Sequence, residues 1–327
     1  MTPETLSYSL VVSPADAGER IDRYVASRVP DVSRAQIQRA AKAGVLNVEG
    51  QPVKVSHRVR EGEKIDVQLI RLEDPDTAPI PESIELDVVY EDDSIIVINK
   101  PAGMVVHPAA GHRTGTLVNA LLGRESFTGI PQSFNRPGIV HRLDMGTSGL
   151  LVCARTESAH RNLANQLKDR TMSRIYLAVA WGHLKSEKTV FDQPIGRSSR
   201  DRKRMAVTPA GRDARTSATI RERFDLADLL EMSLESGRTH QIRVHLSNAG
   251  HPIVGDGDYG GGAAHLRGID PAIRLQGRAM LKAIDRPALH AYHIRLVHPV
   301  TNEKLKFTVK PPPDFLRLVE TCRRPSQ

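Results

Sequence analysis

The chain has 327 residues and carries a formal net charge of +8, with a pI near 9.6. This length suits two domains rather than one. No apolar run is long enough to span a membrane, and the first residues lack the basic and apolar regions of a signal peptide. Two cysteines, Cys153 and Cys322, are too few for a disulfide framework or a zinc knuckle. We therefore expect a cytoplasmic protein without membrane contact, and the basic charge indicates a polyanionic partner.

The positive charge is concentrated in two stretches of the chain. Residues 18–72 hold 11 Lys and Arg against 7 Asp and Glu, and residues 197–223 hold 9 against 3. Residues 72–93 are acidic by contrast. The two basic stretches are therefore the candidates for contact with a nucleic acid.

The first basic stretch is predicted to form a small domain over residues 18–72. Apolar residues at helical spacing predict a helix over Glu19–Val29. A capping box over Ser33–Gln36 then begins a second helix, which ends near Ala43 with Gly44 as its cap. Short strands are expected at Val45–Val48, Val53–Val55 and Lys64–Ile70.

The second of these helices carries a basic face made by Arg34, Arg39 and Lys42. Two short helices with such a face, followed by a small curled sheet, resemble the S4-like RNA-binding domain. A generic helix pair with a solvated charged face is the alternative. Residues 73–84, which are rich in proline and net negative, are predicted to be a linker.

The remaining chain, residues 85–311, is predicted to form the larger domain. Its strands outnumber its helices and often follow one another without a helical crossover, which favours an α+β fold with a mixed, largely antiparallel sheet. The tail from Pro311 is expected to be partly disordered. The predicted strands are Ser94–Asn99, Ile139–His141, Leu150–Ala154, Ile175–Trp181, Ala214–Arg223, Leu229–Leu234, Ala288–His298 and Lys304–Lys310. The predicted helices are Thr116–Leu122, Ser158–Lys168, Thr239–Asn248 and Pro271–Lys282.

The segment from Ile139 to Val152 is the most informative part of this domain. Apolar residues flank a His-Arg-Leu-Asp sequence that ends at Asp144 and is followed by Gly146, Thr147 and other small residues. A carboxylate is rarely buried without a partner. Asp144 therefore either fixes a turn, as Asp beside Gly, Thr and Ser often does, or is held close to a substrate. The spacing alone leaves both readings open.

Four segments together resemble a known family. They are residues 99–108, residues 139–152, the Arg-Ile-Tyr-Leu-Ala-Val stretch 174–179, and residues 234–246 with their Gly-Arg-Thr-His-Gln-Ile-Arg sequence. These segments are similar to the four signatures of the RluA-type pseudouridine synthases, and nearest to the RluD branch. The similarity extends over nearly the whole chain, including the S4-like region.

The resemblance assigns roles to four residues of the larger domain. Asp144 is the catalytic carboxylate, and Arg238 is expected to pair with it and keep it ionised. Arg142 matches the residue that fills the space left by a flipped nucleotide, and Tyr176 matches the tyrosine that stacks on the flipped base. The residues alone also allow other interpretations. Arg238 is then a surface cation, Arg142 a phosphate contact and Tyr176 an aromatic residue of the sheet core.

The resemblance also implies a substrate and a basic RNA contact. The partner is expected to be large-subunit ribosomal RNA, bound by a monomer. Because isomerisation of uridine oxidises nothing and loses no group, no cofactor is expected. The basic loop that contains Arg202, Lys203 and Arg204 is predicted to hold the RNA backbone, although such runs are often merely solvated. Arg243 is expected to reach either RNA or the sheet edge.

Other patterns in the sequence fail as sites. Asp256 begins a sequence similar to a calcium loop, but the twelfth position is Arg267 rather than Glu. No metal motif is found among the histidines. Residues 260–285 are interpreted as an insertion.

An RNA-binding assembly protein without turnover and a two-carboxylate glycosidase remain the alternative functions, and the glycosidase lacks a second candidate carboxylate.

Overall fold

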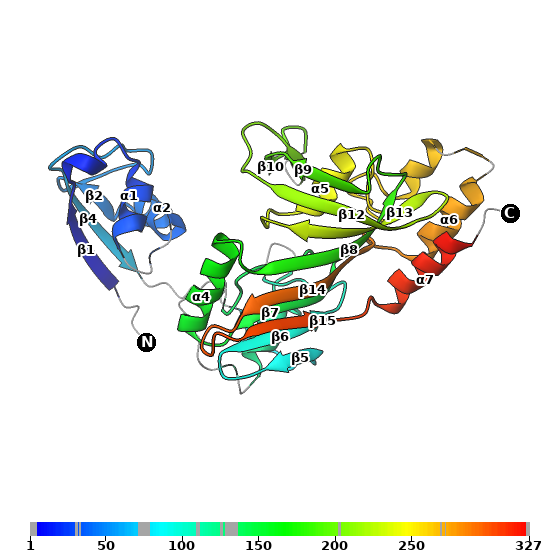
Figure 1. Cartoon of the computed structure of the whole chain (residues 1–327). Coiled ribbons are helices and arrows are strands. Elements are labelled where there is room, and N and C mark those ends of the chain that lie inside the picture. The colour runs from blue at the N-terminus through cyan, green and yellow to red at the C-terminus, as the bar shows by residue number, and fades with distance from the viewer. Residues whose placement is uncertain are drawn as a thin grey trace. The chain divides into compact units, whose positions relative to one another are not determined.

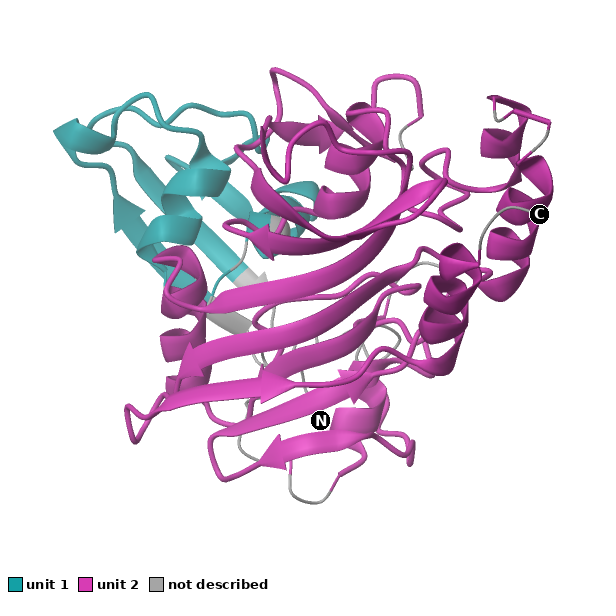
Figure 2. Cartoon of the chain, turned by 45° about the vertical axis from the view of Figure 1, so that its right-hand side comes forward, with its two compact units in different colours: residues 1–78 teal, residues 79–327 magenta. Residues whose placement is uncertain are grey.

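The computed structural model describes residues 5–29, 32, 34–70, 79–108, 112–124, 127, 137–201, 204–268, 270–271 and 273–324. The chain divides into two compact units, residues 1–78 and residues 79–327, which Figure 2 distinguishes by colour. Each unit has its own hydrophobic core. Residues 73–78 of the predicted linker lie outside the described residues, and the rest of it belongs to the second unit.

The first unit is an antiparallel sheet packed against two helices, α1 and α2. The sheet has the strand order β1-β4-β2-β3, and β1 pairs with β4 along its whole length. Fully buried Ile21, Ile37, Leu46 and Ile65 join helices and strands in one core. Its elements are β1 (Thr5–Val11), a 3-10 turn (Pro14–Asp16), α1 (Ile21–Arg28), α2 (Arg34–Lys42), β2 (Leu46–Val48), β3 (Gln51–Pro52) and β4 (Lys64–Ile70).

Three predictions for this unit need correction or lie outside the described residues. The boundary at residue 18 is too late, because β1 supplies an edge strand of the same sheet. The strand predicted at Val53–Val55 is wrong, because the pairing partner of β2 is Gln51–Pro52. The capping box begins at Ser33, which lies outside the described residues, whereas Gly44 adopts the expected left-handed conformation with φ +74°.

The second unit is built on one large bent sheet (Figure 1). Its strand order is β5-β6-β7-β14-β8-β13-β12-β9, and β15 pairs with β14. Strand β14 runs parallel to β7, and the other described pairings of this sheet are antiparallel. The predicted α+β class with a mixed, largely antiparallel sheet is therefore confirmed. The strands are β5 (Val88–Glu91), β6 (Ile95–Lys100), β7 (Ser148–Ala154), β8 (Ser173–Trp181), β9 (Lys188–Asp192), β12 (Arg215–Arg223), β13 (Ala227–Leu234), β14 (Leu289–Val297) and β15 (Lys304–Thr308).

A small hairpin and several helices complete this unit. Helix α3 begins with a capping box at Thr116, the residue at which the helix was predicted to start. Helices α6 and α7 lie beside each other at one end of the sheet (Figure 1). The hairpin strands are β10 (Ile195–Arg197) and β11 (Met205–Val207), and the helices are α3 (Leu117–Leu122), α4 (Glu157–Lys168), α5 (Gln241–Asn248), a 3-10 helix (Ala263–Gly268), α6 (Arg274–Ala283) and α7 (Pro313–Arg323).

Two predictions for the second unit are wrong. Ile139–His141 is not a strand, since Ile139 forms only an isolated bridge to Cys153 and the chain then turns towards Asp144. The tail after Pro311 contains α7, whose Phe315, Leu318 and Val319 are buried in the core. Over the described residues, no helix is long and apolar enough to cross a membrane.

Candidate active site

Asp144 lies in a tight turn that leads directly into β7. The Thr147 amide donates to the Asp144 carbonyl at 3.0 Å, which closes the turn over Met145 and Gly146. Strand β7 starts at Ser148 and pairs with β6 on one side and β14 on the other. The carboxylate is largely enclosed, with 16% of its side chain exposed. Turn chemistry and a buried carboxylate thus occur together in this segment.

Gly149 allows the closest approach of the strands beside this turn. A Cβ at this position would lie 2.3 Å from the carbonyl oxygen of Ala291, and the residue has φ +109°. Only glycine tolerates both conditions. Because Gly149 pairs with Ala291 in the parallel junction of β7 and β14, it fixes where the turn enters the sheet.

Lys100 lies fully buried beneath the same turn. Its Nζ donates to the carbonyls of Pro101 at 2.7 Å and Met104 at 2.9 Å, and reaches that of Met145 at 3.4 Å. Burial lowers the pKa of this ammonium to about 7, and Asp144 partly opposes that shift. The side chain therefore ties strand β6 to the loop that carries Asp144.

Arg286 and Asp314 brace the turn from the C-terminal side of the chain. Arg286 Nη1 donates to the Gly146 carbonyl at 2.9 Å. The same guanidinium donates through Nε and Nη2 to Asp314 in the first turn of α7, at 2.6 and 2.9 Å. Helix α7 therefore contributes to holding the Asp144 loop.

The cation next to the Asp144 carboxylate is Arg243. Its Nη1 lies 3.5 Å from Asp144 Oδ2. Asp256 fixes the guanidinium in a bidentate pair at 2.7 and 2.8 Å, and Asp258 accepts from Nη2 at 2.9 Å. These carboxylates raise the pKa of Arg243 despite its burial, which alone would lower it. Arg243 thus stays charged beside Asp144.

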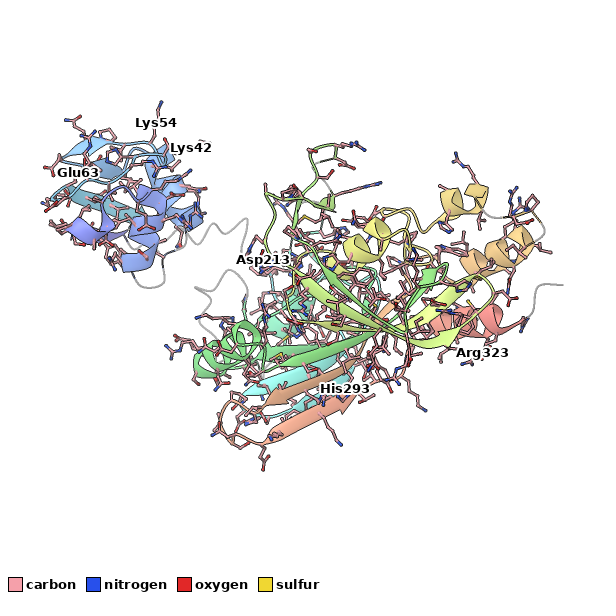
Figure 3. All side chains as sticks on the ribbon, turned by 45° about the horizontal axis from the view of Figure 1, so that its top comes forward. Lys42, Lys54, Glu63, Asp213, His293 and Arg323 are labelled. Carbon is pink, nitrogen blue, oxygen red and sulfur yellow. The ribbon has the colours of Figure 1, made fainter. Side chains whose placement is uncertain are left out.

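The predicted pairing of Arg238 with Asp144 is wrong. Arg238 lies in the loop before α5, and its Nε donates to the backbone carbonyl of Asp213, a residue labelled in Figure 3. Arg243 lies on α5 itself, which begins only at Gln241 after His240 with φ +57°. The buried Asp256 then directs the Arg243 guanidinium to Asp144. Sequence reasoning dismissed Asp256 as a failed calcium ligand, although a charged residue after the apolar stretch Ile253–Val254 was a signal of a buried ion pair.

His240 and Tyr259 complete the surroundings of Asp144. His240 Nε2 is 3.9 Å from Asp144 Oδ1, and its Nδ1 is 2.8 Å from the Tyr259 hydroxyl. Burial is the main cause that lowers the pKa of His240, so the imidazole is neutral near pH 7. The same Tyr259 hydroxyl accepts from the Met205 amide at 3.0 Å, which connects hairpin β10–β11 to the site. Neither residue was recognised from the sequence.

Tyr176 and Arg142 also line the cavity that contains Asp144. Tyr176 lies on β8 with 5% exposure, and burial raises the pKa of its phenol. Arg142 is exposed, two residues before Asp144. The cavity has a volume of about 770 Å³. Its lining includes Asp144, Tyr176, Arg142 and Arg238, the four residues predicted for this site, together with Arg243, which was expected to reach RNA or the sheet edge.

The remaining predicted RNA contacts are distributed over two other places. Arg202 and Lys203 lie outside the described residues, and Arg204 is exposed with its Nε 3.3 Å from Asp201. In the first unit, Arg34 donates to the buried Asp22 at 2.7 Å, which reduces its availability for RNA.

Arg39 and Lys42 are exposed on α2, and Figure 3 shows Lys42 at the surface of the first unit.

Over the described residues, no cluster of three or more His, Cys, Asp or Glu is arranged to hold a metal ion.

Comparisons with known proteins identify the class that this site defines. Residues 94–248 match the family model described as RNA pseudouridylate synthase. A relative named ribosomal large subunit pseudouridine synthase D, from Xanthomonas campestris, is 43% identical and covers 97% of this chain and 92% of its own. The protein of the same name from Pseudomonas aeruginosa is 41% identical, covering 94% and 93%.

The solved structure of human RNA pseudouridylate synthase domain containing 1 aligns with a TM-score of 0.52 at 25% identity, over 71% of this chain and 85% of that one. The chain belongs to the RNA pseudouridine synthase family and is an enzyme of that class. Within the family it is of the RluD type, as its sequence motifs predicted.

Proposed function

We propose that the protein isomerises specific uridines to pseudouridine in large-subunit ribosomal RNA, with Asp144 as its catalytic carboxylate. The observation that carries this proposal is the Asp144–Arg243 pair at the wall of a cavity large enough for a nucleotide. The names of the relatives support the choice of RNA.

The reaction detaches uracil from C1′ of its ribose, turns the base and rejoins it to the same carbon through C5. The C5 proton leaves and N1 gains a proton, so atoms and oxidation state are conserved and no cofactor is required. A carboxylate can assist by adding to C1′, by adding to the uracil ring or by taking a ribose proton. Each route uses the carboxylate of Asp144 itself, and the guanidinium of Arg243 lies 3.5 Å from its Oδ2, where it can orient the group.

Entry of the uridine into the cavity requires that the nucleotide leave its stack. Tyr176 offers a buried ring for the extruded base, and the raised pKa of its phenol keeps the hydroxyl protonated as a donor. Arg142 is exposed beside the cavity, where its planar guanidinium can occupy the gap left in the RNA. Arg238 is positioned at the cavity wall by the Asp213 carbonyl and remains a candidate contact for the substrate.

Two basic regions are proposed to hold the RNA around the target. The first unit acts as an S4-like RNA-binding domain through Arg39 and Lys42 on α2. Arg34 contributes less, because its guanidinium is already paired with Asp22. The basic loop between β10 and β11 acts through Arg202, Lys203 and Arg204. Since both contacts involve phosphates, RNA affinity is expected to fall steeply with salt.

The test is to map pseudouridine after incubation of unmodified ribosomal RNA with the wild-type protein and with Asp144→Asn. Carbodiimide-dependent reverse-transcription stops should appear with the wild type and disappear in the variant, while RNA binding persists. Asp93→Asn serves as a matched control, because this exposed aspartate of the second unit does not line the cavity. Equal stops from wild type and Asp144→Asn would overturn the assignment of Asp144.

A further inference from the structure

Arg174 is a buried cation that no described residue neutralises. Only 7% of this residue on β8 is exposed. Its Nε is fully enclosed without a hydrogen-bond partner, and its guanidinium makes no ion pair with any described residue. A buried charge without a counter-charge destabilises a protein, because no ion pair offsets the loss of hydration. A protein that retains such a residue needs it for something other than stability.

The contrast with Arg243 is direct, because both guanidinium groups border the same cavity. Arg243 is equally buried, at 6% exposure, but contacts Asp144, Asp256 and Asp258. The internal carboxylates near Asp144 are therefore already engaged by one arginine. A counter-charge for Arg174 has to come from outside the described protein.

The position of Arg174 points to the substrate. It lies two residues before Tyr176 on β8, so both side chains share one face of the strand. Both line the cavity with Asp144. Burial raises the pKa of Tyr176, and the nearby charge of Arg174 opposes this larger effect by lowering it. A group bound by Arg174 would thus sit beside the ring proposed to receive the base.

The surroundings of the guanidinium are shaped to leave it room. A Cβ at Gly237 would lie 3.0 Å from Arg174 Nη1, and the backbone of Gly237 does not need a left-handed conformation. The absence of a side chain at Gly237 therefore matters for space rather than for φ. The loop before α5 passes against the guanidinium at the point where its neighbour Arg238 enters the cavity wall.

Two further unpartnered polar atoms lie in the same lining. His141 Nε2 accepts from the Val152 amide at 3.2 Å, so its Nδ1 carries the proton, and this buried Nδ1 has no partner among the described residues. Thr147 Oγ1 is likewise buried without one. Buried polar groups are normally satisfied. Like Arg174 Nε, these atoms belong to residues that line the cavity, so this part of the wall holds more polar groups than the described residues satisfy.

We propose that Arg174 binds the phosphate next to the target nucleotide, so that the substrate supplies the missing counter-charge; this inference rests on the proposed function. The uracil ring is neutral, whereas each nucleotide carries an anionic phosphodiester. A guanidinium fork matches two phosphate oxygens. Arg174 is then a substrate-positioning contact that holds the ribose of the flipped nucleotide within reach of Asp144.

The experiment uses an RNA hairpin that contains a uridine identified by the pseudouridine mapping described above. Hairpins are made with a neutral methylphosphonate in place of the phosphate 5′ or 3′ of that uridine. Their affinities are measured for the full-length wild type and for Arg174→Met. For the wild type, one of the two replacements should weaken binding about tenfold to a hundredfold, as expected for loss of a charge-assisted contact.

Arg174→Met should show the same loss on the natural hairpin and no further loss on the methylphosphonate one. Such coupling is the signature of a direct contact. The salt dependence of binding should also decrease by about one phosphate. Arg161→Gln is the matched control, since Arg161 is an exposed arginine of α4 that pairs only with Glu157 at 3.3 Å among described residues.

Three outcomes would overturn the proposal. Additive losses from the variant and the methylphosphonate would show that Arg174 does not bind that phosphate. Coupling of Arg174 to a 4-thiouridine substitution instead would assign it to the base. A marked fall in the unfolding midpoint of Arg174→Met would reveal a structural role, because removal of an unpaired buried charge should leave stability equal or higher. If the wild type modified no ribosomal uridine, the proposed function would fail first.

Discussion

Asp22 in the first unit is a fully buried carboxylate and Asp144 in the second is a largely enclosed one, and their environments are opposite. Asp22 is fully buried and accepts from Arg20 at 3.0 Å, Arg34 at 2.7 Å and Gln38 at 3.4 Å. Asp144 has one arginine at 3.5 Å and opens into a cavity. The saturated carboxylate stabilises a helix pair, whereas the unsaturated one retains lone pairs for a substrate. Burial of a charge therefore signals function only when its partners do not already satisfy it.

The largest expected effect comes from removal of the arginine beside Asp144. Arg243→Met should leave Asp256 buried without its bidentate partner and destabilise the protein by about 3–5 kcal/mol, measured by urea unfolding. Single-turnover pseudouridine formation should fall by about a hundredfold or more, as for loss of one preorganised charge. Arg238→Met should cost much less stability, since its Nε contacts a neutral carbonyl. An activity loss as large in Arg238→Met as in Arg243→Met would favour the pairing predicted from sequence.

The second prediction concerns the saturated carboxylate. Burial alone would raise the pKa of Asp22, but hydrogen bonds from Arg34, Arg20 and Gln38 outweigh it and lower the pKa to about 2. Because the folded value lies below the unfolded one, this stabilisation is present above about pH 4 and is lost as the pH falls through about 2. Asp22→Asn should destabilise the first unit by about 2–3 kcal/mol at neutral pH.

Amide hydrogen exchange in β1 and β4 of the full-length protein measures this effect. Faster exchange should be confined to the first unit, and pseudouridine formation on a short hairpin should be retained. A loss of exchange protection around Asp144 would contradict the separation of the two units.

The third prediction tests the brace behind Asp144. Asp314→Asn weakens the pair with Arg286 and should cost about 1–2 kcal/mol, because the pair is only partly buried. The loop at Gly146 then loses part of its support, so kcat should fall severalfold with little change in KM. Glu320→Gln, on the exposed side of α7, should change neither. An unchanged kcat in Asp314→Asn would show that the brace serves stability alone.

The smallest effect is expected at the surface of the first unit. Lys42→Gln should weaken RNA binding a few-fold and reduce its salt dependence by about one phosphate, without a change in stability. Lys64→Gln is the control, because Lys64 is an exposed lysine of β4 that lies 3.8 Å from Asp66. Equal losses in the two variants would mean that general charge, rather than the face of α2, attracts the RNA.

The candidate site was predictable to the extent that it lies in contiguous motifs. Asp144, Tyr176 and Arg142 stand within short recognisable segments, and the structure brings them to one cavity. The identity of the counter-charge was not predictable, because Arg238 and Arg243 occur in the same motif. The choice depends on Asp256, which reaches Arg243 only through the fold. Arg174 carried no signal either, since an unpaired buried charge is defined by what surrounds it.

The fold shows the same division between local and long-range information. Apolar spacing predicted β4 and β7 closely, because their burial follows from their own residues. The short strands β9, β10 and β11 were missed, since their pairing depends on partners rather than on their composition. The tail from Pro311 was expected to be partly disordered, although proline at the first helical position is a normal helix start.

The contacts that join Asp314 through Arg286 to Gly146 affect how the protein folds while it is being synthesised. The loop that carries Asp144 emerges from the ribosome long before its brace does. A nascent chain that ends before α7 has all the residues named in the catalytic proposal. It lacks Asp314, and Arg286 is therefore without the carboxylate that holds it against the Asp144 loop. The loop that carries Asp144 therefore gains this support only after α7 has been synthesised and Asp314 has paired with Arg286.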